Sequence, residues 1–155
     1  MIERMCRILV VGLVITFFVN AGILFAKDEK VITPKETGVY VKTNKGLKRI
    51  LPNIVFTNEQ GVYYIVMNNP AQFLLKDFEY FVMYGNYQTD YLTLHPMPPL
   101  DASLLGKQSF MFGKIIDIDV KKQGKDLYIV KPKGLLGRGY LSLWIEDTAW
   151  DFILD

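Results

Sequence analysis

The chain has 155 residues, with 18 lysine and arginine residues against 16 aspartate and glutamate residues, and a net charge of +2. This balance gives no electrostatic reason to expect nucleic acid or a strongly anionic membrane surface as a partner, since both need a concentrated basic face. A single histidine and a single cysteine exclude a multi-histidine metal site and an internal disulfide.

The amino-terminal segment, residues 1–26, predicts export. Arg4 and Arg7 precede a stretch at 8–26 that carries no charged residue. This pattern is typical of a signal peptide or of a membrane anchor. We therefore expect a protein of the periplasm or cell envelope, which is anchored in the inner membrane through residues 8–26 only if the segment stays uncleaved.

The polar interruption at 20–22 favours cleavage of this segment, because it leaves an apolar stretch of ordinary signal-peptide length before it. Cleavage after Ala21 and cleavage after Ala26 are both open. Cys6 lies too early for lipidation at either junction. Retention as an anchor is the alternative.

Residues 27–37 predict a polar linker, and residues 38–155 predict a single β-domain. Aromatic and β-branched residues are frequent there, and Gly, Pro, Asn and Asp recur between short apolar runs. The first half predicts strands at 38–43, 47–51, 54–57, 62–67, 78–84 and 87–94. Residues 73–84 have some helix-like spacing, but composition and alternation favour a strand, with a short helical turn around 70–75 left open.

The prolines of 96–99 divide the domain into two halves. They remove backbone donors, so residues 95–101 predict an extended crossover. The second half predicts strands at 109–114, 116–121, 126–131, 140–145 and 150–154. Residues 116–121 show the clearest two-residue period, with their three apolar side chains expected to face inward.

Many short strands in one domain, with turn residues between them, indicate an all-β fold. We expect an antiparallel immunoglobulin-like β-sandwich, with a small β-barrel as the alternative, preceded by an N-terminal hydrophobic helix. Tyr140 follows a glycine-rich loop and opens an alternating strand. A tyrosine corner, which hydrogen-bonds backbone a few residues upstream, is one interpretation of Tyr140, and an ordinary core tyrosine is the other.

Two stretches resemble a loosely defined set of exported bacterial β-domains of unknown function. The early stretch is Gly38-Val39-Tyr40 with Leu47, and the late one holds Leu135, Tyr140 and Leu143. The chain has Gly137-Arg138-Gly139 where that set has Pro-Gly-Glu. The resemblance implies an envelope location and an immunoglobulin-like sandwich, and it implies no activity.

His95 is the one histidine that could act as a catalytic base. Ser103 or Ser109 as nucleophile, and Asp90 or Asp101 as orienting group, lie near it in the sequence. No nucleophile-elbow motif presents a serine, however. A histidine in a surface loop is the simpler interpretation.

Two acidic groups could bind calcium or act in glycoside hydrolysis: Asp117 with Asp119, and Glu146 with Asp147 and Asp151. Their spacing does not match a calcium-binding loop. We expect solvent-facing charges that protect strand edges from aggregation.

Tyr140, Trp144 and Trp150 gather around the last predicted hairpin and are the candidate ligand-binding residues. Exposed rings on a β-sandwich are a platform on which sugar rings stack. The alternation within 140–145 requires one face of that strand to lie in the core, so core packing is the competing interpretation.

These observations predict a non-catalytic binding or structural module with no catalytic residue, cofactor or metal. Its expected partner is another envelope protein, engaged by strand addition to an exposed sheet edge, or a glycan. The alternatives are a glycan-binding module that uses Tyr140, Trp144 and Trp150, and a small hydrolase.

Overall fold

The computed structural model describes residues 32–54, 56–58, 61–65, 69–104 and 107–155. Residues 33–155 form one compact unit. The expected signal peptide or anchor at 1–26, with its hydrophobic helix, lies outside the described residues, as does the end of the predicted strand 62–67. No helix within the described ranges is long and apolar enough to span a membrane.

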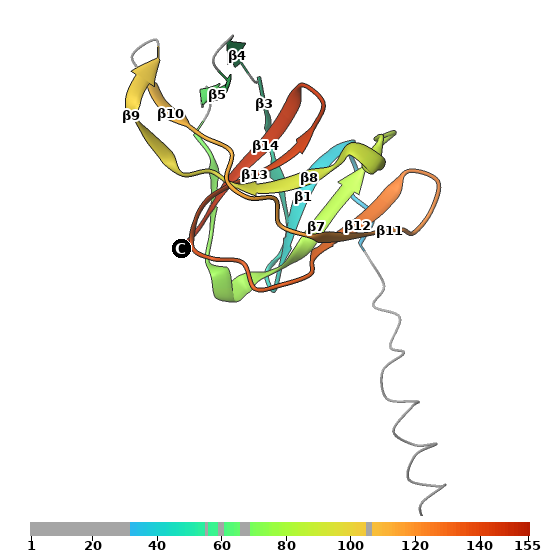
Figure 1. Ribbon diagram of the computed structural model, residues 1–155. Helices are drawn as coiled ribbons and strands as arrows, with labels where there is room; N and C mark the ends of the chain where they lie inside the picture. The colour runs from blue at the N-terminus through green and yellow to red at the C-terminus, as the bar shows by residue number, and fades with distance from the viewer. Residues whose placement is uncertain (1–31, 55, 59–60, 66–68, 105–106) are drawn as a thin grey trace, which may run out of the picture. The chain divides into compact units, whose positions relative to one another are not determined.

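The first sheet is antiparallel and has five strands (Figure 1). In spatial order they are β11 (Ile118–Lys122), β12 (Leu127–Pro132), β7 (Phe78–Tyr84), β1 (Gly38–Thr43) and β2 (Gly46–Ile50). β7 lies at the centre, and β11 and β2 form the two edges. This order leaves β11 paired on one side only within the sheet.

The second sheet is built around the carboxyl-terminal hairpin. Its strands are β3 (Pro52–Ile54), β14 (Thr148–Leu154), β13 (Gly139–Ile145) and β8 (Thr93–Pro96), and β6 (Ala71–Phe73) pairs with β14 in the parallel direction. A smaller sheet holds β4 (Phe56–Asn58), β5 (Gly61–Ile65), β10 (Lys107–Phe110) and β9 (Pro99–Leu104). Two short 3-10 turns, η1 (Leu75–Asp77) and η2 (Thr89–Tyr91), complete the described elements. The expected all-β fold with antiparallel sheets is confirmed.

The hydrophobic core lies between the first and second sheets. It draws alternate residues from both, such as Val39 and Val41 of β1 and Leu141 and Leu143 of β13. Period-two alternation places these side chains on one face of each strand. Phe81 of β7 meets Phe152 of β14 edge to face, with ring centroids 5.2 Å apart, so this aromatic contact joins the two sheets at the centre of the core.

The two sheets are also connected along both sides. On one side β2 continues through Leu51 into β3, so one stretch of chain leaves the first sheet and joins the second. On the other side Ile116 forms an isolated bridge with Leu94 of β8, just before β11 begins. The arrangement therefore combines face-to-face sheets with the corner crossings that are common in barrel-like β-domains.

The strand predicted at 87–94 is shorter than expected. Residues 89–91 form the 3-10 turn η2, and β8 begins only at Thr93. The predicted crossover at 95–101 likewise differs, because its ends belong to β8 and β9. Proline is tolerated in these two strands because a strand position whose N–H is not needed by the ladder accepts it. The helical turn that the sequence leaves open around 70–75 is replaced there by β6, and a 3-10 turn follows at Leu75–Asp77.

β7 is buried on both faces, and the prediction of inward-facing side chains at 116–121 holds only in part. In the central strand β7, Tyr80 and Val82 are buried as well as the core residues Phe81 and Met83, so side chains on both faces of this strand are covered. In β11, Val120 is 38% exposed although it lies on the inner side of the strand. An edge strand extends past the facing sheet, so its inward residues are only partly covered.

The tyrosine-corner hydrogen bond occurs at Tyr40 and not at Tyr140. The Tyr40 hydroxyl donates to the Glu36 carbonyl oxygen, four residues upstream, at 2.8 Å. The Tyr140 hydroxyl is buried and makes no hydrogen bond within the described residues. The Gly-x-Tyr opening of β1, rather than the glycine-rich loop before β13, therefore carries this corner.

Candidate binding surfaces

The three aromatic residues predicted to bind a ligand do not share one surface. Trp150 is 5% exposed and lies in the core between the sheets, where its ring meets that of Tyr87 at 5.8 Å. Tyr140 and Trp144 alternate with the core residues of β13 and therefore face the opposite side of the second sheet. A platform made by all three rings is not present.

Tyr140 and Trp144 are themselves covered by the end of β10 and the segment that follows it. Phe110 stacks on Tyr140 with ring centroids 4.4 Å apart, and Phe112 lies against Trp144 at 4.1 Å. The Trp144 indole N–H donates to the Glu146 carbonyl oxygen. Both rings are half-buried, so this face is mainly a second, smaller packing layer.

The same layer contains buried polar groups. Asp151 is 3% exposed, and the Asn53 amide nitrogen donates to its carboxylate at 2.6 Å. The expectation that Asp151 is a solvent-facing charge is therefore wrong, whereas Asp117, Asp119 and the Glu146–Asp147 turn are exposed as expected. Asp151 lies opposite Ser142 on the outer side of β14, and the Phe110 segment covers that side.

The burial of Tyr140 leads to a prediction about the stability of the protein at alkaline pH. Burial, with a smaller effect of the neighbouring Asp151 carboxylate, raises the pKa of its phenol above the ordinary 10.0. A pKa that is higher in the folded state contributes stability that is complete below pH 10 and is lost as the pH rises above it. Tyr140→Phe should therefore lose less stability above about pH 10 than the native protein does.

Urea unfolding at neutral and alkaline pH measures this difference. At neutral pH the phenylalanine variant should differ from the native protein by no more than about 1 kcal/mol, the size of one hydrogen bond, because the removed hydroxyl is buried beside the Asp151 carboxylate. Tyr91→Phe, at an exposed tyrosine, is the control and should leave the alkaline loss unchanged. An alkaline loss in Tyr140→Phe equal to that of the native protein would contradict the assignment.

His95 lies in β8 and not in a surface loop. Its Nδ1 contacts the Gly113 carbonyl oxygen at 3.1 Å, and its Nε2 contacts the Thr93 hydroxyl at 3.0 Å. The ring also packs edge to face on Phe112 at 5.1 Å. The Nδ1 contact and the packing on Phe112 therefore attach the segment after β10 to the second sheet, whereas the Nε2 contact stays within β8. Within the described ranges, no cluster of three or more His, Cys, Asp or Glu residues could hold a metal ion.

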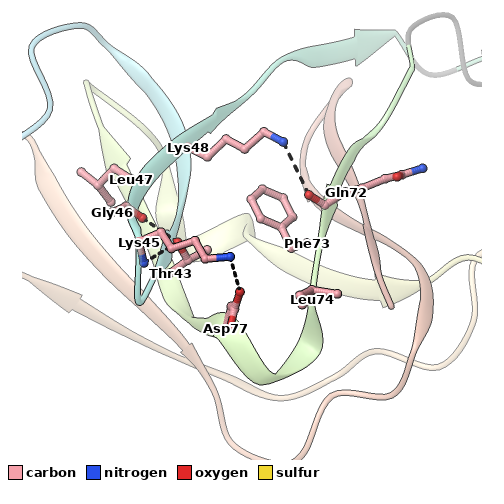
Figure 2. A pocket seen from close by; sticks show the side chains of 9 residues that line it. All are labelled: Thr43, Lys45, Gly46, Leu47, Lys48, Gln72, Phe73, Leu74 and Asp77. Atoms are coloured by element: carbon pink, nitrogen blue, oxygen red, sulfur yellow. Dashed lines mark hydrogen bonds and ion pairs between the residues drawn. The ribbon is translucent and has the colours of Figure 1, made fainter.

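A pocket of about 290 Å³ opens between β2 and β6 (Figure 2). The beginning of β14 pairs with β3, which continues directly from β2, whereas the end of β14 pairs with β6. The pocket lies where the beginning of β2 is separated from the second sheet and β6 has taken the place of β3 beside β14. Phe73 lies in the pocket, and Lys45, Lys48 and Asp77 bring charge to it. No sequence motif marked these residues, because they come from separate elements.

The two lysines of this pocket are held differently. Lys45 Nζ lies 3.2 Å from an Asp77 carboxylate oxygen, to which the Asn44 amide also donates. Lys48 Nζ lies 5.0 Å from the centre of the Phe73 ring and donates to the Gln72 carbonyl oxygen at 3.5 Å. The charge of Lys45 is thus neutralised locally, whereas Lys48 keeps a positive charge over an aromatic ring.

The contact between Lys45 and Asp77 leads to a prediction about the pKa of Asp77. Its hydrogen bond lowers the pKa of Asp77 below 3.8, with burial acting in the opposite direction and Asn44 adding to the lowering. Lys45→Met should therefore raise this pKa, measured by the carboxyl chemical shift during an NMR titration. The native stability that the pair contributes is present above pH 3.8 and is lost as the pH falls through the folded pKa.

Lys76→Met is the matched control, since Lys76 acts on Asp77 only through its charge and more weakly. It should move the Asp77 titration much less than Lys45→Met does. Equal shifts in the two variants would show that the hydrogen bond from Lys45 is not the main cause.

β11 presents an exposed strand edge. Lys133 N donates to the Asp117 carbonyl oxygen and Gln123 N donates to the Leu127 carbonyl oxygen, so the odd-numbered residues of this strand bond to β12. In an antiparallel pair the alternate residues, here the even-numbered ones, direct their N–H and C=O groups away from β12. Ile116 confirms the direction, because its N–H donates outward to the Leu94 carbonyl oxygen at 2.8 Å.

We define the β11 edge as the outward backbone groups of Ile118, Val120 and Lys122. The register of the Leu94–Ile116 bridge would place residues 90 and 92 beside this edge, but η2 interrupts β8 there. Among the residues that the structure describes, no strand pairs with the β11 edge. Backbone groups in this state are a template for an added strand.

Comparisons with protein-family models, with curated proteins and with solved structures returned no match for this chain.

Proposed function

We propose that the chain is an exported β-domain of the cell envelope and acts as a non-catalytic binding module. It would belong with the exported bacterial β-domains that it resembles. Its fold would be an immunoglobulin-like sandwich, with a small barrel as the alternative. The core that the two sheets share supports the sandwich. The crossings between the sheets at Leu51 and Ile116 support the small barrel.

The β11 edge is the observation that carries this proposal. Its strand is exposed, lies at the end of a sheet and directs alternate backbone groups outward. An extended segment of an envelope protein could add to it as a further antiparallel or parallel strand. Backbone hydrogen bonds would then supply affinity, and the side chains of the edge strand would supply specificity.

The test compares Val120→Pro with Val120→Thr in the protein as the cell processes it, captured from the envelope after cross-linking. Proline at 120 removes an outward N–H and leaves the bonds of the neighbouring odd-numbered residues to β12. Threonine keeps the N–H and the β-branched shape. We expect the cross-linked partner to be lost with proline and kept with threonine, while both variants retain the native thermal midpoint. The same partner recovered with Val120→Pro would contradict strand addition at this edge.

The β2–β6 pocket favours glycan binding as a second candidate function. Its aromatic ring under an ammonium group, beside a polar rim, suits a sugar that carries a carboxylate. This site replaces the shared platform of Tyr140, Trp144 and Trp150. Calorimetry with uronate-containing and neutral oligosaccharides should show binding of the acidic sugars alone, abolished by Lys48→Ala and kept by Lys125→Ala. Binding that survives Lys48→Ala would exclude the pocket.

A further inference from the structure

We propose that the strand added to the β11 edge is β11 of a second copy of this chain, in an antiparallel pair centred on Val120. This inference rests on the proposed function, since it names the partner of the same edge. Backbone direction, charge pattern and exposure each support it.

Backbone direction allows this pairing. The outward groups belong to Ile118, Val120 and Lys122, as the bonds of the odd-numbered residues to β12 establish. A twofold axis through Val120 places each Val120 opposite the partner's Val120, and each Ile118 opposite the partner's Lys122. Every outward residue then faces another outward residue, which an antiparallel ladder requires for hydrogen-bonded pairs. The first sheet would continue across the axis into its copy.

The charge pattern of β11 favours the register centred on Val120 over the registers next to it. In the register centred on Val120, Asp119 lies opposite the partner's Lys121, and Lys121 lies opposite the partner's Asp119. These are non-hydrogen-bonded positions, where side chains approach most closely. Moving the axis by one residue in either direction, which changes the register by two residues, places Asp119 opposite the partner's Asp119 or Lys121 opposite the partner's Lys121, so like charges face each other at the axis. Of these three registers, the one centred on Val120 is therefore the one that brings no like charges of this strand opposite each other.

The exposed side chains fit the same arrangement. Asp119 and Lys121 point to the outer side of the sheet, where Asp119 already has Lys133 at 3.3 Å as a second cationic neighbour. Val120 is 38% exposed on the inner side, and pairing would bring the two Val120 side chains together. Only a short strand is shared, so the buried area falls below that of a standard stable interface. We therefore expect a dimer that forms and dissociates with concentration.

Sedimentation velocity on the protein as the cell processes it, in detergent and over about 1 μM to about 1 mM, measures this equilibrium. The native protein should shift from monomer to dimer across the range. Asp119→Lys and Lys121→Asp should each weaken the dimer at least about tenfold, because each reverses two ion pairs into repulsions. Lys125→Asp makes the same charge change as Lys121→Asp, but in the adjacent turn, and should leave the dimer unchanged.

Mixing the two single variants gives the decisive result. Asp119→Lys supplies two positive side chains and Lys121→Asp supplies two negative ones, so the mixed pair has two attractive contacts in the register centred on Val120. We expect the mixture to dimerise where each variant alone stays monomeric. A mixture that remains monomeric, or a native protein that is monomeric at the highest concentration, would overturn self-pairing.

The outcome also separates this inference from the proposed function. If the native protein stays monomeric but Val120→Pro still removes a different cross-linked envelope protein, strand addition stands and the second copy is the wrong partner. If the chain neither dimerises nor loses any partner through Val120→Pro, both the inference and the proposed function fail.

Discussion

Phe81→Ala should destabilise the protein by about 3 to 5 kcal/mol, the range found when a buried phenylalanine is truncated in a packed core. Phe81 is fully buried on the central strand β7. Its ring meets Phe152 of the opposite sheet at 5.2 Å and Phe78 at 5.0 Å, so alanine would leave a cavity where the two sheets meet. Urea unfolding followed by circular dichroism measures the loss.

Phe78→Ala is the matched control, because it removes the same ring from a half-buried position at the start of the same strand. Its cost should be clearly smaller. Since small domains have total stabilities of about 5 to 15 kcal/mol, the Phe81 variant is expected to be marginally folded. Equal losses for the two variants would show that the core is not centred on the contact between Phe81 and Phe152.

Asn53→Ala should cost about 2 to 4 kcal/mol, which is large for the removal of one amide. The Asn53 amide donates to the Asp151 carboxylate at 2.6 Å, and both residues are nearly inaccessible to solvent. Truncation would leave a buried, charged oxygen without this donor, and the desolvation of a charge is expensive. Asp151 is not otherwise altered, so the loss reports the contact between β3 and β14.

A double-mutant cycle separates this contact from packing. Once Asp151→Asn has removed the charge, Asn53→Ala should cost less than it does in the native protein, with a coupling of about 1 kcal/mol or more. Thermal and urea unfolding of the four proteins provide the values. Additive losses would mean that the Asn53–Asp151 hydrogen bond does not contribute to stability.

The strands that sequence predicted well have strong local signals. β1, β12 and β13 are rich in β-branched, aromatic and leucine residues and lie between turns rich in Gly, Asn and Lys, and their observed bounds lie within a residue or two of the predicted ones. Residues 87–94 have the same composition, yet most of them do not form a strand. The choice there depends on which strand lies alongside, and that is a tertiary property that no local pattern contains.

The candidate site residues divide in the same way. Alternation in β13 correctly required one face to be core, but it could not show that Trp150 faces this core or that Phe112 covers Trp144. Asp151 looked like part of a solvent-facing acidic turn, and its burial depends on Asn53, which is distant in the sequence. The β2–β6 pocket escaped prediction because it forms where two strands separate.

The exposed charges of β11 were predicted, but their meaning depends on the structure. Alternation alone makes Asp119 and Lys121 edge charges that would discourage pairing. Only the direction of the backbone groups, known from the bonds of 117 and 123 to β12, shows which registers an added strand could take. In one of these registers the same charges attract each other across the edge.

Amide hydrogen exchange of β11, followed by NMR in the processed protein at low and high concentration, tests the central claim most directly. Asp119 and Lys121 donate to β12 and should be protected at both concentrations, whereas the outward amides of Val120 and Lys122 should exchange quickly in the dilute sample and slowly in the concentrated one. Outward amides that exchange equally fast at both concentrations, with the odd-numbered ones still protected, would contradict self-pairing at the β11 edge.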